Sequence, residues 1–269
     1  MRNLSTLAWR VYDAPTKPWH GVVADTEGDD SVYVMRVERR DGVSQLTLAH
    51  ITPTGTEELA VLEVASAPPH VPDVADFRLL ADGGSSVNHM PAICVIGSGG
   101  DIVLMPVDEE ASAPAEVVGS VDQGILAAAW SPEEDVLVLI TGGEKRLIVM
   151  TREFEVMSET MLSTEAFGDD QPVNVGWGSK STQFHGSEGK QAAMAAANAP
   201  EESDPRGPLV PEDDGLPRIS WRGDGAFFVT SSAEASHDTV HRILRTYTRT
   251  GTLSATSDRS VRGISHVLA

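Results

Sequence analysis

Several short stretches combine residue types that bind phosphate in other proteins. Gly97-Ser98-Gly99-Gly100 is glycine-rich like a phosphate-binding loop. It joins two predicted strands, however, whereas a dinucleotide fingerprint needs a helix directly after the loop. Gly186-Ser187-Glu188-Gly189-Lys190 is similar to the end of a nucleotide-binding motif, but Phe184 replaces its first glycine and Gln191 replaces its final Ser or Thr. We therefore expect two turns and no cofactor.

Two further stretches suggest a metal site and a receptor-binding tripeptide. His237 and His241 have the spacing of two metal ligands on a helix. They lie in a turn-rich stretch between strands, without a nearby cysteine or third histidine, so we expect two solvated loop histidines and no metal. Arg222-Gly223-Asp224 spells an integrin-type tripeptide, which we interpret as a tight turn between strands.

Nucleophilic catalysis has no supporting pattern either. Serine, histidine and aspartate all occur, but no Gly-x-Ser-x-Gly elbow or comparable context surrounds a serine. Cys94 lies in an apolar predicted strand, where a thiol behaves as a small hydrophobic group. The sequence predicts a protein that has no catalytic residues and is not an enzyme.

Composition narrows the class of protein and its compartment. The 269 residues carry 40 acidic and 20 basic side chains, a formal net charge of −20 that repels phosphate backbones and disfavours extensive direct nucleic-acid binding. A single cysteine excludes an internal disulfide and suits a reducing compartment. No apolar run is long enough to cross a bilayer, and no secretory segment is present. We expect a soluble cytoplasmic protein, with the nucleus as a second location.

Three tryptophans lie in closely related settings and define an internal repeat. Trp130, Trp177 and Trp221 are 47 and 44 residues apart, and each ends an apolar run and begins a polar turn. A period of about 40–45 residues with about four short strands per unit is typical of propeller blades. One blade cannot bury both of its faces, so neighbouring blades stack, and we expect the tryptophan at that contact. The alternative is three unrelated core tryptophans.

Runs of alternating or continuous apolar residues, separated by turn residues, predict the strands of these units. The predicted strands cover residues 31–37, 44–49, 58–64, 77–80, 91–96, 102–105, 116–121, 125–130, 136–140, 147–150, 154–162, 173–177, 218–221, 226–231, 242–247 and 251–256. We count about five units, with little room for helices. The predicted fold is all-β, a β-propeller of the WD-repeat type with an incomplete ring of about five blades.

Two segments depart from this pattern. Residues 191–214 are rich in Ala, Pro, Glu, Asp and Ser and cannot bury enough apolar area to order themselves, so we expect a long, disordered, low-complexity loop. After Gly263 the sequence reads Ile264 to Ala269 and stops, a pattern typical of the opening strand of another blade. We therefore interpret residues 1–269 as the N-terminal part of a propeller domain, truncated at the start of a further blade.

Several segments match one known family. They are Met1 to Leu4, Ile125 to Pro132, Phe154 to Val156, Val173 to Lys190, Ile219 to Gly225, and Arg245, Tyr247, Arg249, Gly251 and Leu253. Together they resemble the largest subunit of Elongator, the eukaryotic complex that modifies transfer RNA. The run from Val173 to Lys190 is long and specific. The resemblance is firm over residues 120–269 and looser over residues 1–119.

The resemblance implies a scaffold subunit. In that family the chain begins with two WD-type propellers and continues into an α-helical region that dimerises; the second propeller and the dimerisation region are absent from this sequence. The subunit holds the catalytic radical-SAM and acetyltransferase subunit and a second propeller subunit. The complex places a carboxymethyl-type group on carbon five of the wobble uridine, so the resemblance implies that tRNA meets this chain only indirectly.

The stretch from Trp177 to Lys190 is a candidate docking surface, because polar and aromatic residues crowd a turn-rich segment. The candidate residues are Trp177, Lys180, Gln183, Phe184, His185 and Lys190. The alternative is that Trp177 and Phe184 pack between blades and the polar residues cap loops. Two other functions stay open: a stand-alone WD-type adaptor that binds a protein or peptide partner, and a propeller hydrolase. The hydrolase would need Asp, His and Ser on central strands that are apolar here.

Overall fold

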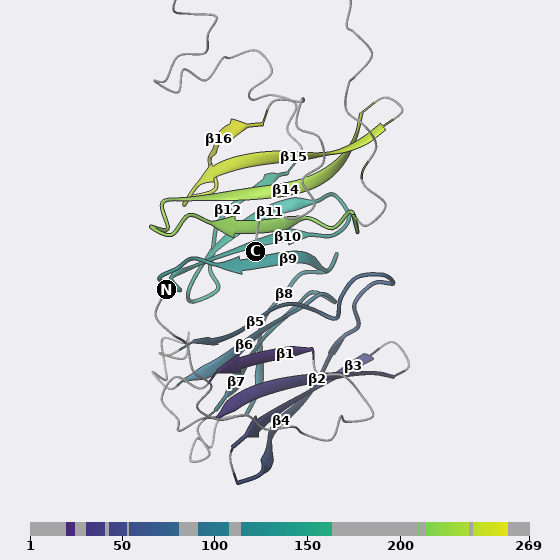
Figure 1. Cartoon of the computed structure of the whole chain (residues 1–269), viewed down its shortest axis with the longest axis vertical. Coiled ribbons are helices and arrows are strands. Elements are labelled where there is room, and N and C mark those ends of the chain that lie inside the picture. Colours follow the sequence, from purple (N-terminus) through teal and green to yellow (C-terminus); the bar gives the residue numbers. More distant parts are fainter. Residues whose placement is uncertain are drawn as a thin grey trace, which may run out of the picture. The chain divides into compact units, whose positions relative to one another are not determined.

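The computed structural model describes residues 20–24, 31–40, 43–52, 54–80, 91–107, 114–162, 209, 213–236 and 239–257. These residues form sixteen strands arranged as four antiparallel sheets of four strands each (Figure 1). Within the described ranges there is no helix, and hence none that is long and apolar enough to span a membrane. The prediction of an all-β fold is confirmed. The chain divides into two compact units, residues 1–122 and 123–269.

The first unit contains two sheets in which every strand pairs with its neighbours in sequence. The strands of the first sheet are β1 (Gly21–Ala24), β2 (Val32–Arg40), β3 (Val43–Ile51) and β4 (Thr56–Ala65). Those of the second are β5 (Val74–Leu80), β6 (Ala92–Gly97), β7 (Asp101–Pro106) and β8 (Glu116–Ser120). The pairing of Arg40 with Val43 leaves two residues between β2 and β3, so these two strands form a tight hairpin.

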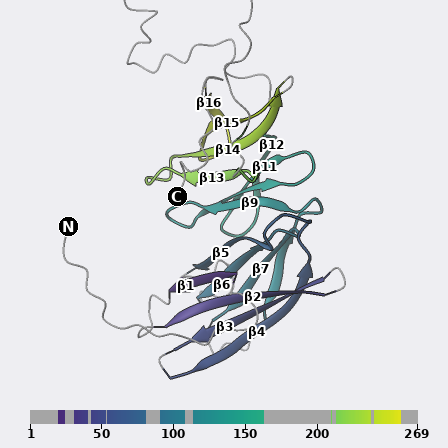
Figure 2. The same ribbon diagram turned by 45° about the vertical axis from the view of Figure 1, so that its right-hand side comes forward.

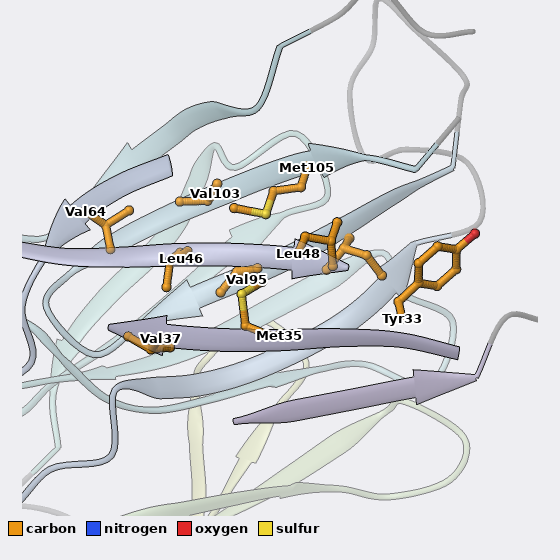
Figure 3. Packing of buried hydrophobic residues seen from close by; sticks show 10 residues of the cluster. Tyr33, Met35, Val37, Leu46, Leu48, Val64, Val95, Val103 and Met105 are labelled. Carbon is orange, nitrogen blue, oxygen red and sulfur yellow. The ribbon is translucent and has the colours of Figure 1, made fainter. Parts of the chain in front are cut away.

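The core of the first unit lies between these two sheets (Figure 3). Met35 and Leu48 from the first sheet and Val95 and Met105 from the second are fully buried in it. Alternation along β2 places every second side chain on this face, whereas β6 is buried on both faces. Burial of each large apolar side chain contributes about 1.5–3 kcal/mol, so this contact holds the two sheets together.

At one end of this core, the turn between β6 and β7 lies very close to the backbone at the end of β4. A Cβ atom at Gly99 would lie 2.0 Å from the carbonyl oxygen of Ala65, so only glycine fits in the turn between β6 and β7. The carboxylate of Asp101 accepts hydrogen bonds from the Ala65 backbone N–H (2.7 Å) and from Ser120 Oγ (2.9 Å). The end of β4 is thereby tied to both β7 and β8.

The second unit repeats the same arrangement twice. Its strands are β9 (Ile125–Trp130), β10 (Val136–Thr141), β11 (Arg146–Thr151) and β12 (Val156–Met161), then β13 (Arg218–Trp221), β14 (Phe227–Ser236), β15 (Thr239–Thr248) and β16 (Leu253–Thr256). Trp130 ends β9 and Trp221 ends β13, as the repeat predicted. β14 and β15 are longer than predicted and extend beyond β13 and β16 (Figure 1).

The two sheets of the second unit pack directly against each other, with β13 beside β9 (Figure 2). Trp221 Nε1 donates a hydrogen bond to the Ala129 carbonyl oxygen on β9 (3.2 Å), so this tryptophan lies at the contact between neighbouring sheets as predicted. Phe228 is fully buried at the centre and stacks on Tyr247, with ring centroids 5.3 Å apart. The unit predicted around Trp177 lies outside the described residues.

Replacing Gly99 with alanine is expected to destabilise the first unit. The added methyl group would collide with the Ala65 backbone, and such overpacking costs about 1–3 kcal/mol of unfolding free energy. Gly55→Ala is the matched control, because nothing lies within 4 Å of the position that its added methyl group would take, and it should shift stability by no more than about 0.5 kcal/mol. Urea denaturation measures both. Equal stability of the two variants would contradict the close approach.

Candidate protein-interaction surface

The predicted docking residues are all outside the part of the chain that the structure describes. They are Trp177, Lys180, Gln183, Phe184, His185 and Lys190. Their role in docking therefore stays a prediction from the sequence.

Three of the stretches with possible chemistry lie in ordinary strands and turns. The Gly100 backbone N–H donates to the Gly97 carbonyl oxygen (3.0 Å), which confirms the turn between β6 and β7. Cys94 is fully buried in β6, as expected for a small hydrophobic group. His241 belongs to β15, so the prediction of a loop there was wrong at this residue; His237 lies outside the described residues. The described ranges hold no group of three His, Cys, Asp or Glu residues that could bind a metal.

A buried ion pair holds the chain where it returns to the sheet before β13. Arg242 binds the carboxylate of Asp213 through two nitrogens, with Nε–Oδ2 and Nη2–Oδ1 distances of 2.6 and 2.5 Å. Both side chains are almost fully buried, and Arg242 Nη1 also donates to the Leu216 carbonyl oxygen (3.0 Å). The hydrogen bond from Arg242 lowers the pKa of Asp213. Asp213 and Asp214, the last residues of the predicted disordered segment, are instead held by Arg242.

A second arginine pair lies further along the same strands. Arg245 on β15 forms an ion pair with Glu234 on β14, and its Nη2–Oε2 distance is 3.0 Å. Burial raises the pKa of Glu234, but the hydrogen bond and charge of Arg245 outweigh it, and the net pKa is lowered. Lys145 Nζ, from the turn between β10 and β11, donates to the Ala233 carbonyl oxygen (3.2 Å). Arg245 and Glu234 therefore neutralise each other, and the Lys145 hydrogen bond links the two sheets.

Asp76 on β5 is a partly buried carboxyl group whose pKa is raised. Burial raises its pKa to about 6, although a backbone hydrogen bond from Phe77 and the charge of Arg78 act in the opposite direction. A pKa near neutral is common in catalytic acids, but acid–base catalysis also needs a positioned partner. Among the described residues, Asp76 belongs to no group of three His, Cys, Asp or Glu residues that could bind a metal.

The turns at one end of the second unit form a continuous charged surface, which we call the turn rim. It comprises residues 131–135, 152–155, 222–226 and 249–252, because in antiparallel sheets these alternate turns lie at the same end. Arg249 joins the turns of both sheets: it forms an ion pair with Asp135, and its Nη1 lies 3.5 Å from the Gly225 carbonyl oxygen. The rim is therefore one surface rather than separate loops.

Side-chain hydrogen bonds and an ion pair close the turns of the rim. Ser131 Oγ accepts hydrogen bonds from the backbone N–H groups of Asp135 (3.2 Å) and Val136 (3.1 Å), which closes the turn after Trp130. In the next sheet Arg222 pairs with Asp224 at 2.5 Å and lowers the pKa of that carboxyl to about 2. The Arg222-Gly223-Asp224 tripeptide is thus a tight turn between strands, as predicted, and its arginine and aspartate bind each other.

The turn rim has the properties of a protein-binding surface. Its exposed residues include Glu133, Glu153 and Glu155, so the rim is acidic at fixed positions. Preformed turns on a rigid sheet framework bind partners with little loss of conformational entropy. This geometry makes the turn rim a candidate surface for binding other proteins.

Replacing Arg242 with alanine is expected to cost at least about 2 kcal/mol of unfolding free energy, because Asp213 would stay buried without its partner. The matched control is Arg222→Ala, whose exposed pair with Asp224 should contribute nothing measurable. Because the pKa of Asp213 is lowered in the folded chain, the Arg242 effect should be complete at neutral pH and shrink below the usual aspartate pKa. Denaturant unfolding at several pH values measures it; equal effects of the two variants would contradict the assignment.

Comparison with known proteins places the whole chain in one family. A family described as "ELP1 first N-terminal beta-propeller" matches residues 1–269. Elongator complex protein 1 from Mus musculus is 32% identical over 280 residues, covering 100% of this chain and 18% of that protein. The protein of the same name from Schizosaccharomyces pombe is 38% identical over 169 residues, covering 62% of this chain and 13% of that protein.

A third relative agrees with these two. Elongator complex protein 1 from Drosophila melanogaster is 40% identical over 172 residues, covering 63% of this chain and 13% of that protein. The chain therefore spans less than a fifth of the length of the curated relatives that it matches. The resemblance found in the sequence and the prediction of a β-propeller are both confirmed: the chain belongs to the ELP1 first N-terminal beta-propeller family.

Proposed function

We propose that this chain is part of a non-catalytic scaffold subunit of the Elongator complex. The observation that carries the proposal is the match of all 269 residues to Elongator complex protein 1. The described structure supports it, because rigid turns and neutralised charges are suited to holding other proteins. In this role the chain supports modification of the wobble uridine of tRNA to 5-carboxymethyl-type derivatives without taking part in the reaction.

The partners that we propose are other subunits of the complex. They are the catalytic radical-SAM and acetyltransferase subunit and a second propeller subunit. The net charge of −20 disfavours direct contact with the tRNA backbone, so we place tRNA on the partners rather than on this chain. The proposed docking segment runs from Trp177 to Lys190, and the proposed location is the cytoplasm, with the nucleus as a second site.

A triple substitution in the docking segment tests the proposal. We expect Lys180→Ala, Gln183→Ala and His185→Ala, made together in the full-length protein, to weaken binding of the catalytic subunit by tenfold or more, because loss of about 1.4 kcal/mol of contact energy has that effect. Co-purification of tagged protein with the catalytic subunit, measured by quantitative mass spectrometry, gives the readout. A second readout is the level of the modified wobble uridine in tRNA.

The control carries three alanines on an outer strand of the first unit. Glu57, Glu58 and Glu63 are exposed on β4, so their replacement removes three polar side chains without disturbing the core. This variant should retain the catalytic subunit. Retention by both variants would remove the docking segment from the proposal, and a wild-type protein that co-purifies with no Elongator subunit would overturn the scaffold role itself.

A further inference from the structure

The outer strand of the third sheet, β12, has one edge that is free of other strands within the described part of the chain. It pairs with β11 on one side, and no described strand pairs with its other side. A hydrogen bond from the Leu162 N–H to the Lys145 carbonyl oxygen sets the register, so Thr160 and Ser158 direct their backbone groups toward β11. By alternation, the backbone groups of Glu159 and Met161 point away from the sheet. They form a short template on which another strand could pair.

The side chains of β12 are unusually apolar for an exposed edge. Val156, Met157 and Met161 are 59%, 46% and 40% exposed. The one carboxylate of the strand, on Glu159, is already bound by Arg146 Nη1 at 2.7 Å. Methionine side chains are flexible and adapt their shape to a partner. Two exposed methionines are therefore better suited to an edge that binds another strand than to an edge that contacts only water.

The other three outer strands of the described sheets differ from β12. β4 carries three exposed glutamates, which oppose strand addition, whereas β8 and β16 are only five and four residues long. Short edges and edge charges are the usual protection against pairing with another chain. A register shift occurs in all four outer pairings, so a bulge does not distinguish β12 from the others. β12 differs from them in combining six residues and three exposed apolar side chains with a single carboxylate that Arg146 already binds.

Charge indicates what kind of strand would bind there. Glu153 and Glu155 are exposed in the turn that leads into β12, and neither pairs with a cation among the described residues. The whole chain carries a net charge of −20. This surface would therefore favour binding of a segment with two properties. The segment would carry Lys or Arg where it passes these glutamates, and apolar residues at alternate positions where it passes the methionines.

We infer that the free edge of β12 binds an extended, basic segment of a partner subunit by strand addition, with backbone hydrogen bonds to Glu159 and Met161. The inference rests on the proposed function for the identity of the assembly, but it uses a surface separate from the Trp177–Lys190 segment. Backbone pairing would provide the affinity, and the apolar side chains and glutamates of β12 and its preceding turn would select the sequence.

Amide hydrogen exchange in the assembled complex tests the edge directly. The full-length protein is measured alone and together with the other Elongator subunits. We expect exchange at the Glu159 and Met161 amides to slow by about tenfold or more on assembly, since free edge amides are open to solvent and paired ones are not. The outer edges of β4 and β8 should keep their exchange rates, because their protection against pairing is intact.

A pair of charge substitutions provides the second arm. Met157→Lys with Met161→Lys places two positive charges on the edge, where they repel a basic segment, and should abolish the slowing at Glu159. The matched control is Val61→Lys with Val117→Lys, at positions 45% and 47% exposed on β4 and β8, which should leave the slowing unchanged. Unchanged exchange of the β10 amides shows that each variant is folded.

The outcomes separate the inference from the function on which it rests. Slowing at Glu159 and Met161 that the methionine variant loses and the valine variant keeps supports strand addition. Equal exchange in the free and fully assembled protein overturns it while leaving the scaffold role intact. Slowing that depends only on the concentration of the isolated protein means that a second copy occupies the edge, which also overturns the inference. Failure of the wild type to assemble with Elongator subunits overturns both.

Discussion

The packing of the two sheets in the second unit centres on Phe228, which is fully buried between them. Its ring stacks on Tyr247 from the neighbouring strand and contacts Trp221, with centroids 4.9 Å apart. On the other side, β10 presents Val136, Val138 and Ile140 to the same cluster. A four-stranded sheet with two apolar faces is not stable alone in water, so stacking is the condition for each sheet to exist.

Two ion pairs of the second unit also follow from the need to bury the surfaces of these sheets. Where the apolar side chains of β14 and β15 end, Arg245 and Glu234 form an ion pair between these two strands, and Lys145 of the other sheet donates to the Ala233 carbonyl oxygen. A buried charge without a partner would cost several kcal/mol, so the pairing is needed for the strands to extend this far. Arg242 and Asp213 use the same chemistry to hold the chain that leads into β13. The charges inside the unit therefore serve structure, whereas Glu133, Glu153 and Glu155 on its turns are exposed.

The sequence predicted the parts of the fold that depend on local pattern. β9 was predicted at its observed bounds because an apolar run ends at Trp130 and a serine-led turn follows. β1 was missed, since four residues give no periodic signal and the strand is defined by pairing with β2. β14 was predicted too short because Ser232 to Ser236 include no large apolar residue, and their place in the strand depends on pairing with β15.

The candidate surfaces were harder to predict from the sequence than the strands, because they depend on contacts between residues that are far apart in the chain. Arg242 and Asp213 are 29 residues apart, and no local pattern brings the second into contact with the first. The rise in the pKa of Asp76 likewise depends on burial by residues distant in sequence. The exposure of β12 follows from its place at the end of the sheet order, which alternation along one strand does not reveal. The docking residues between Trp177 and Lys190 were suggested by residue type and stay a prediction.

The claim that the two sheets of the second unit stabilise each other is tested most directly by hydrogen exchange in a Phe228→Leu variant. Phe228 lies on β14, but its ring fills the space between the sheets, so removing part of it should loosen both. We predict that amides of β10 and β14 lose protection together, each by roughly tenfold. Loss of protection confined to β14, with β10 unchanged, would show that the sheets are independently stable and would contradict the account.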